Sequence, residues 1–147
     1  MVVRPSRVEP MPAACWKLYA GTGRMTSALA EAGLVVAPPM ELETGAWGNA
    51  HRPRTIAFLM KMVRTRKVLY IHLGTPCTYW VVSTNNRGVH EAVGRMSVSV
   101  TARLIAYCIR FGVWYTLDNP MSSAIWKQPA IQRLLSRGEK FTDVDYC

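Results

Sequence analysis

The stretch Val68–Trp80, VLYIHLGTPCTYW, decides how this chain folds. Its first six residues, Val68–Leu73, have the β-branched and apolar character of a buried strand, and Gly74 ends that strand. The next residues then enter a loop, in which Pro76 stiffens the backbone beside Cys77. Open α/β sheets bind their ligands at the carboxyl ends of the strands. Cys77 is therefore a candidate nucleophile, and the alternative is a buried, inert thiol.

Short apolar runs alternate with helical patterns along the rest of the chain. We expect strands at Ala14–Tyr19, Leu34–Ala37, Val68–Leu73 and Val113–Leu117, and helices at Met25–Ala32, Pro53–Thr65, Glu91–Phe111 and Pro129–Ser136. The tail Phe141–Cys147 is a candidate last strand. Strands that alternate with helices predict βαβ units and a mostly parallel sheet, so the expected fold class is α/β.

The longest predicted helix, Glu91–Phe111, has one apolar face and one basic face. The apolar face is predicted to hold Val93, Met96, Val100, Leu104, Cys108 and Phe111, and a different face holds Arg95, Arg103 and Arg110. Gly112 follows as the C-cap.

Composition and charge restrict the class of protein. The chain has 147 residues, which favours one domain; we expect a loose lead-in at 1–13 and a single domain at 14–147. Lys and Arg outnumber Asp and Glu by 18 to 9, and this net charge of +9 favours a nucleic-acid partner; the alternative is a basic enzyme with no such partner.

The cysteines and the N-terminal residues indicate the compartment. The four cysteines are scattered singly and the three histidines lack metal-ligand spacing, so no zinc site is expected. Residues 1–12 contain no apolar signal core, which favours an intracellular protein of cytoplasm or nucleus. A virus- or phage-encoded origin stays open. The longest stretch without charges, 68–86, is broken by Gly, Pro and Asn, so no membrane span is expected.

Two further loops follow predicted strands. Gly21, Thr22 and Gly23 form a turn that lets the backbone approach a ligand ahead of a helix N-terminus. Glu41 and Glu43 are equal candidates for a contact to a ribose hydroxyl. The alternative for residues 21–23 is a plain tight turn that binds no ligand.

The loop Asp118–Pro120 follows the predicted strand Val113–Leu117 in the same manner. A carboxylate at Asp118 could act as an acid or hydrogen-bond to a heterocyclic substrate. The alternative is an Asx turn before proline, which Asp118 and Asn119 both favour.

Taken together, the three loops resemble the catalytic half of the cytosine-5 methyltransferases. The stretch LYAGTGRMTSALAEAGL at 18–34 is similar to that family's first motif, HLGTPCT at 72–78 to its Pro-Cys loop, and LDNP at 117–120 to its Glu-Asn loop. SSAIW at 122–126 resembles what methyltransferase-like relatives of phage and protist origin carry after that loop. The resemblance implies a Rossmann-like three-layer sandwich of the S-adenosylmethionine-dependent methyltransferase type, in a minimal or truncated form without a separate target-recognition domain.

The resemblance also assigns roles to residues. Cys77 would attack carbon 6 of a cytosine base, and the expected substrate is DNA rather than RNA. Asp118 would take the place of the family's Glu and stabilise protonation at ring nitrogen 3. S-adenosylmethionine would supply the methyl group for carbon 5. The residues expected around this cofactor are Tyr19, Gly21, Thr22, Gly23, Glu41, Glu43, Pro76 and Asn119. Arg87 and Arg95 are candidates for phosphate contacts.

Two other functions stay open. The first is a methyltransferase fold without catalysis that binds nucleic acid or a partner chain, in which case the partner would supply target recognition. The second is an amino-group methyltransferase, but that class would carry an Asp- or Asn-Pro-Pro-Tyr loop where this chain has Thr75, Pro76 and Cys77.

Overall fold

The structure is a computed structural model that describes residues 14–19, 24–38, 40, 51–76 and 87–139. Its elements are β1 (Ala14–Leu18), α1 (Arg24–Glu31), α3 (Pro53–Arg64), β2 (Val68–Leu73), α4 (Arg87–Phe111), β3 (Trp114–Leu117), the 3-10 helix η2 (Ala124–Lys127) and α5 (Pro129–Leu135). The predicted alternation of strands and helices is confirmed. Helix α4 begins four residues before the predicted Glu91, and the candidate strand 141–147 lies outside the described residues.

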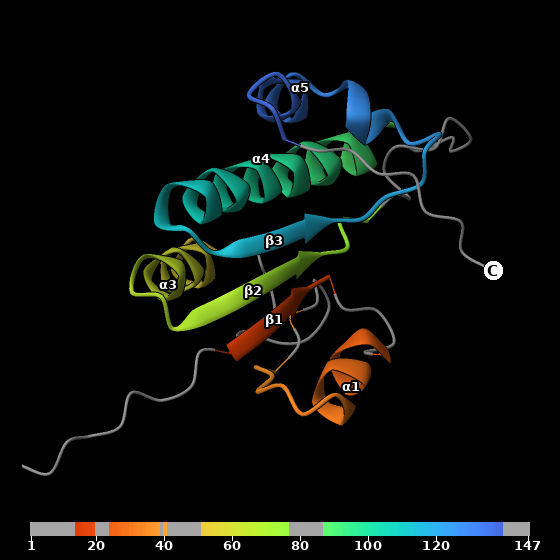
Figure 1. Ribbon diagram of the computed structural model, residues 1–147. Helices are drawn as coiled ribbons and strands as arrows, with labels where there is room; N and C mark the ends of the chain where they lie inside the picture. Colours follow the sequence, from red (N-terminus) through yellow and green to blue (C-terminus); the bar gives the residue numbers. More distant parts are fainter. Residues whose placement is uncertain (1–13, 20–23, 39, 41–50, 77–86, 140–147) are drawn as a thin grey trace, which may run out of the picture.

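The described strands form a parallel sheet in the order β1-β2-β3 (Figure 1). The register aligns Leu18 with Leu73 and Leu73 with Leu117, so the three carboxyl ends lie level. This is an α/β fold with a small parallel sheet, compatible with a Rossmann-like architecture.

The predicted strand Leu34–Ala37 is wrong as a continuous strand. Only two isolated parallel bridges join this region to β1, from Val36 to Cys15 and from Met40 to Leu18. Pro38 lies between the two bridges and has no amide hydrogen, so the ladder cannot continue through it. The segment nevertheless runs along the outer edge of β1, because the Met40 amide donates to the Lys17 carbonyl over 3.0 Å.

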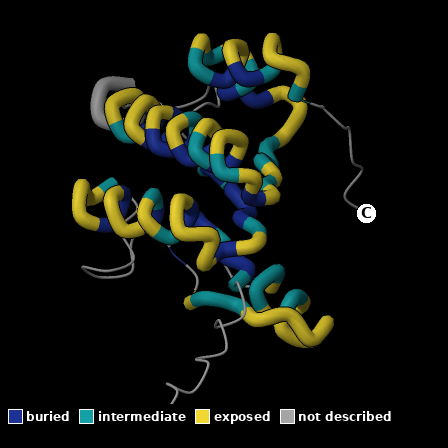
Figure 2. The backbone as a smooth tube through the Cα atoms, turned by 60° about the vertical axis from the view of Figure 1, so that its left-hand side comes forward, coloured by how far each residue is buried: buried dark blue, intermediate teal, exposed yellow. Residues whose placement is uncertain are grey.

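One face of the sheet packs on α3 and α4 and forms the core. The side chains of Trp16, Leu18, Ile71 and Leu73 alternate along β1 and β2 and are all buried. The Trp16 ring meets Phe58 of α3 edge-on at a centroid distance of 5.7 Å. In Figure 2 the buried positions gather between the helices and the sheet, and exposed positions cover the outer sides of the helices.

The buried face of α4 differs from the predicted one. Leu104 and Cys108 are fully buried as expected, but Met96 is 47% exposed. Its place is taken by the neighbouring Ser97 and, one turn on, by Thr101, both fully buried. The prediction was based on apolar side chains alone. It therefore left out Ser97 and Thr101, whose buried hydroxyls are hydrogen-bonded.

Helix α4 is apolar because it is the core helix. Its segment Glu91–Phe111 is, among the described residues, the one helix long and apolar enough to cross a membrane by length and composition. However, it packs on α3, α5 and β3, and that packing accounts for its apolar face.

Gly112 ends α4 as predicted, in a backbone conformation that suits glycine. Its φ is +67°, and a Cβ at this position would lie 2.9 Å from the guanidinium of Arg66. The Arg66 Nε donates a hydrogen bond of 2.9 Å to the Phe111 carbonyl, so the arginine caps the end of the helix.

We predict that Leu104→Ala lowers the free energy of unfolding by about 2–5 kcal/mol, because it opens a cavity at a fully buried position. The matched change Ile109→Ala, at a position 43% exposed on the same helix, should cost within about 0.5 kcal/mol. Urea unfolding followed by circular dichroism measures both. Equal losses in the two variants would contradict the assignment of the buried face.

Candidate functional site

The carboxyl ends of the three strands meet at one edge of the sheet. The Gly74 amide donates to the Leu18 carbonyl over 3.2 Å, and the Asp118 amide donates to the Leu73 carbonyl over 3.0 Å. These two bonds continue the ladders one residue past the strands. The residues that follow β1, β2 and β3 therefore start side by side, which is where open parallel sheets bind ligands.

The structure describes four of the ten predicted site residues. Tyr19, Pro76, Asp118 and Asn119 all lie at this carboxyl edge. The other six lie outside the described residues: Gly21, Thr22, Gly23, Glu41, Glu43 and Cys77. Tyr19 and Pro76 lead into two of the three predicted loops, and Asp118 and Asn119 belong to the third. The structure thus places parts of all three at one edge of the sheet.

Asn119 joins the loop after β3 to the loop after β2. Its Nδ2 donates to the Thr75 carbonyl over 2.5 Å, and the hydroxyl of Thr75 lies 2.8 Å from that of Thr101 on α4. Thr75 is only 2% exposed. Both contacts hold the backbone two residues before Cys77, so the chain enters that loop from a fixed position.

Tyr19 occupies a strained position directly after β1. Its φ is +58°, which is uncommon for a residue other than glycine, and its side chain is buried. The hydroxyl lies 3.4 Å from Nε2 of His51, whose ring is also 3.0 Å from the hydroxyl of Ser97. Gly74 fits against this corner, since a Cβ there would lie 3.2 Å from the Tyr19 carbonyl.

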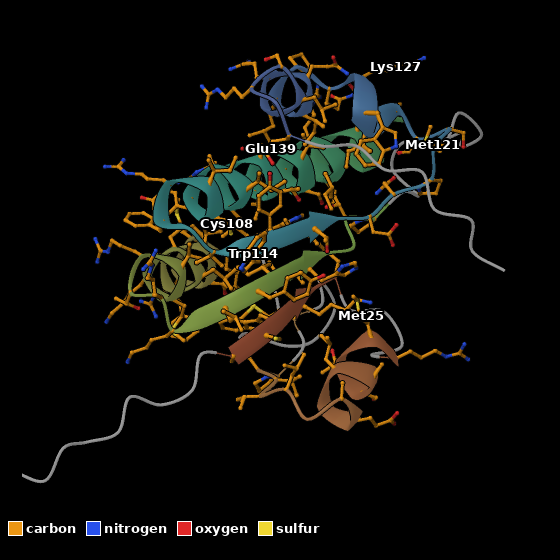
Figure 3. The ribbon with its side chains drawn as sticks, in the orientation of Figure 1. Met25, Cys108, Trp114, Met121, Lys127 and Glu139 are labelled. Carbon is orange, nitrogen blue, oxygen red and sulfur yellow. The ribbon has the colours of Figure 1, made fainter. Side chains whose placement is uncertain are left out.

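A cavity of about 710 Å³ runs from this edge down the side of β3. The described residues that line it are Met25, Tyr70, His72, Ile105, Val113, Trp114, Tyr115, Thr116, Leu117, Asp118, Asn119, Pro120, Met121, Trp126, Ile131, Leu134, Leu135, Gly138 and Glu139. Figure 3 shows Trp114 on β3, Met25 at the start of α1 and Met121 past the carboxyl end of β3. Its size and mainly apolar lining are typical of small-molecule sites.

A polar cluster on β2 and β3 forms part of the cavity wall. The Thr116 hydroxyl lies 2.6 Å from the Tyr70 hydroxyl and 2.8 Å from Nδ1 of His72. Burial lowers the pKa of His72, Lys17 lowers it further and Asp118 opposes the shift, so the ring stays neutral near pH 7. This cluster was not predicted from the sequence, although the alternation of β2 places Tyr70 and His72 on one face.

The described cysteines lack the properties of reactive thiols. Cys15 and Cys108 are both free and buried. Burial raises the pKa of Cys15 and raises that of Cys108 to about 12, so both stay protonated at neutral pH. Neither Cys15 nor Cys108 is therefore a candidate nucleophile.

The described residues contain no cluster of metal ligands, and the chain has no match among known proteins. Within the part of the chain that the structure describes, no group of three or more His, Cys, Asp or Glu residues could hold a metal ion. No protein-family model, no curated protein and no solved structure matches the chain.

We predict that the free energy of unfolding falls as pH is lowered from 7 to 5. The pKa values of His51 and His72 are lowered by burial, so the unfolded chain binds protons at a higher pH than the folded one. This part of the stability is complete above the unfolded pKa of about 6.5 and is lost as pH falls toward the folded values.

The variant His72→Asn should reduce this slope, because Asn can keep a hydrogen bond to Thr116 but does not titrate. Tyr70→Phe removes a hydroxyl from the same cluster and should leave the slope unchanged. Denaturant unfolding at several pH values measures the slopes. A slope for His72→Asn equal to that of the unaltered chain would count against a buried, neutral His72.

Proposed function

We propose that this protein is an S-adenosylmethionine-dependent methyltransferase of Rossmann-like, three-layer type that methylates carbon 5 of cytosine in DNA. The observation that carries the proposal is the junction between two predicted loops. Asn119 binds the Thr75 carbonyl, and this contact couples the Asp118–Pro120 loop to the segment that leads into Cys77. The two residues proposed to act on the base thus belong to loops joined by a direct hydrogen bond.

Two buried polar atoms support a bound cofactor at this edge. Among the described residues, Thr26 Oγ1 and Asn119 Oδ1 are the buried side-chain N or O atoms without a hydrogen-bond partner. Native proteins leave few such atoms unpaired, so each one needs an explanation. Thr26 lies in the first turn of α1, and its neighbour Met25 lines the same cavity as Asn119. A ligand with several donor groups would satisfy both atoms.

S-adenosylmethionine has such groups in its amino and hydroxyl functions, and its sulfonium supplies an electrophilic methyl group. The turn at 21–23 would let the backbone approach it closely, with Glu41 or Glu43 on the ribose. Tyr19, Pro76 and Asn119 would complete the surroundings, as the resemblance implies.

The proposed chemistry at the base belongs to Cys77 and Asp118. The Cys77 thiolate would form a bond to carbon 6 of cytosine, while Asp118 holds a proton at ring nitrogen 3. Electron density would then rise at carbon 5, which would take the methyl group from the cofactor's sulfonium, so that a neutral thioether leaves. Loss of the carbon 5 proton to a base expels the Cys77 sulfur and restores the double bond. The Asp118 backbone is held by its hydrogen bond to Leu73, which limits its movement at the edge.

The surface charge supports a polyanionic substrate. The net charge of +9 favours association with DNA through its phosphates. Arg95, one of the candidates for a phosphate contact, is exposed on α4 and forms a 2.9 Å ion pair with Glu91. Because an exposed ion pair is weak, a phosphate could compete for this arginine.

A fold that binds nucleic acid without methylating it is the second candidate. The same net charge of +9 favours it. The two functions differ in whether the chain binds S-adenosylmethionine and transfers its methyl group.

The test is transfer of a labelled methyl group from S-adenosylmethionine to duplex DNA by the full chain. We expect Cys77→Ser to lower the rate by at least about 1,000-fold, because the nucleophile is lost. Asp118→Asn should lower it by about 100- to 10,000-fold, the usual contribution of a positioned acid. Cys147→Ser, a change of a second thiol, serves as the matched control and should keep the activity.

A second measurement uses DNA in which fluorine replaces the carbon 5 hydrogen of cytosine. The fluorine cannot leave as a proton does, so the bond to Cys77 should persist in denaturing gels, and Cys77→Ser should abolish it. Full methyl transfer by Cys77→Ser would rule out this mechanism. Salt-sensitive DNA binding, together with no heat of binding for S-adenosylmethionine, would favour the second candidate.

A further inference from the structure

The excess positive charge of the chain belongs to one segment. Residues 44–117, which include α3, β2, α4 and β3, contain ten basic residues and a single acidic residue, Glu91. The remaining residues contain eight basic and eight acidic residues, so they are neutral as a group. The net charge of +9 is therefore the charge of this segment. A charge concentrated in this way favours a polyanion as the partner.

Helix α3 carries part of this charge in a stripe along its outer side. Four exposed residues recur at intervals of three or four and therefore share one side of the helix: Arg54, Ala57, Lys61 and Arg64. The buried residues of α3 lie on its other side. Phe58 borders the stripe, but its ring packs edge-on against Trp16. The stripe itself thus holds three cations and one small side chain.

Helix α4 carries a matching stripe. Six exposed residues recur at the same intervals on the side away from the core: Ala92, Arg95, Ser99, Arg103, Ala106 and Arg110. Serine or alanine separates the three arginines from one another. No acidic and no large apolar residue belongs to either stripe.

The two stripes lie side by side. Helices α3 and α4 pack against each other, and each ends where the next strand begins (Figure 1). Nη2 of Arg103 lies 3.9 Å from Sδ of Met60, so the α4 stripe reaches across to α3. Because packed helices have axes about 8–10 Å apart, the stripes form one basic surface, here called the α3–α4 face.

Most cations of this face have no ion-pair partner within the part of the chain that the structure describes. The one ion pair there joins Arg95 to Glu91. The helix dipole favours cations in a last turn, but Arg54 lies in the first turn of α3, which contains no acidic residue, and Arg103 lies well before the end of α4. The dipole therefore gives no reason for a cation at either position, whereas a bound polyanion does.

The side chains of the α3–α4 face indicate which polyanion it suits. Arginine binds phosphate oxygens through two parallel hydrogen bonds. Seven residues separate Arg103 from Arg110, which is about 10 Å along the helix, so the charges form a row. The stripes lack the large apolar side chains that a protein interface or a lipid surface would bury. Their alanine and serine residues let a charged rod approach closely, as the backbone of a nucleic acid would.

We propose that the α3–α4 face binds the phosphate backbone of duplex DNA. None of its residues lines the cavity beside β3, so this contact lies outside the site at the carboxyl edge of the sheet. Phosphate contacts fix the position of the DNA and do not read its bases. The choice of DNA over RNA rests on the proposed function, but the phosphate contacts themselves do not require methyl transfer.

The test measures how salt weakens binding of the full chain to a dye-labelled DNA duplex of about 30 base pairs, followed by fluorescence anisotropy without S-adenosylmethionine. The variant that combines Lys61→Gln, Arg103→Gln and Arg110→Gln removes three contacts. Each phosphate contact contributes about 0.9 to the slope of log affinity against log salt, so the slope should become shallower by about 3. At about 0.1 M salt the affinity should fall at least about 10-fold.

A matched control removes the same number and kinds of charge elsewhere on the surface. It combines Lys127→Gln, Arg133→Gln and Arg137→Gln, three exposed cations of η2, α5 and the turn after it. This control should keep the salt slope of the unaltered chain. A charge-conserving variant, Lys61→Arg with Arg103→Lys and Arg110→Lys, should keep it as well, which separates loss of charge from loss of fold.

Equal salt slopes for the two glutamine triple variants would overturn the proposal. Tighter binding to duplex RNA, or to vesicles of phosphatidylserine and phosphatidylcholine, than to duplex DNA would also overturn it, because the face would then serve another partner. A chain that binds DNA as expected but transfers no methyl group would contradict the proposed function and would support this inference alone.

Discussion

The central position of β2 between β1 and β3 is the constraint on which the rest of the structure depends. Two backbone hydrogen bonds, Gly74 to Leu18 and Asp118 to Leu73, extend its ladders to the carboxyl edge. They place the first residues after all three strands at one level. Because α3 and α4 cover one face of these strands, burial of Ile71 and Leu73 fixes the register, and a shift by one residue would expose both.

Hydrogen bonds hold the residues at the carboxyl edge of this sheet in fixed positions. Asn119 holds Thr75, and Thr75 in turn meets Thr101 of α4, so a chain of hydrogen bonds links two loops to the core helix. The cavity beside β3 then has two parts with different chemistry. Its carboxyl end holds Asp118 and Asn119, and the rest of its described lining, which includes Leu134 and Leu135 of α5, is mainly apolar.

Much of the fold was predictable because each strand and helix carries its own local signal. Gly112 ends α4 as expected, and proline begins α3 and α5 as expected. Contacts between distant residues were not predictable, since the His51–Ser97 and His72–Thr116 pairs depend on packing rather than spacing. The spacing of apolar residues predicts Met96 on the buried face of α4. Ser97 and Thr101 are buried there instead, and their polar side chains give no such signal in the sequence. At the site, the positions of Asp118 and Asn119 followed from strand ends alone.

The most direct test of the central claim is a crystal structure of the chain with S-adenosylhomocysteine, the demethylated cofactor. The account predicts that this ligand binds at the carboxyl edge and gives hydrogen-bond partners to Asn119 Oδ1 and Thr26 Oγ1, with Cys77 and Asp118 facing one shared space beside it. A structure with the ligand bound elsewhere, or with those two atoms still unpaired beside it, would contradict the account.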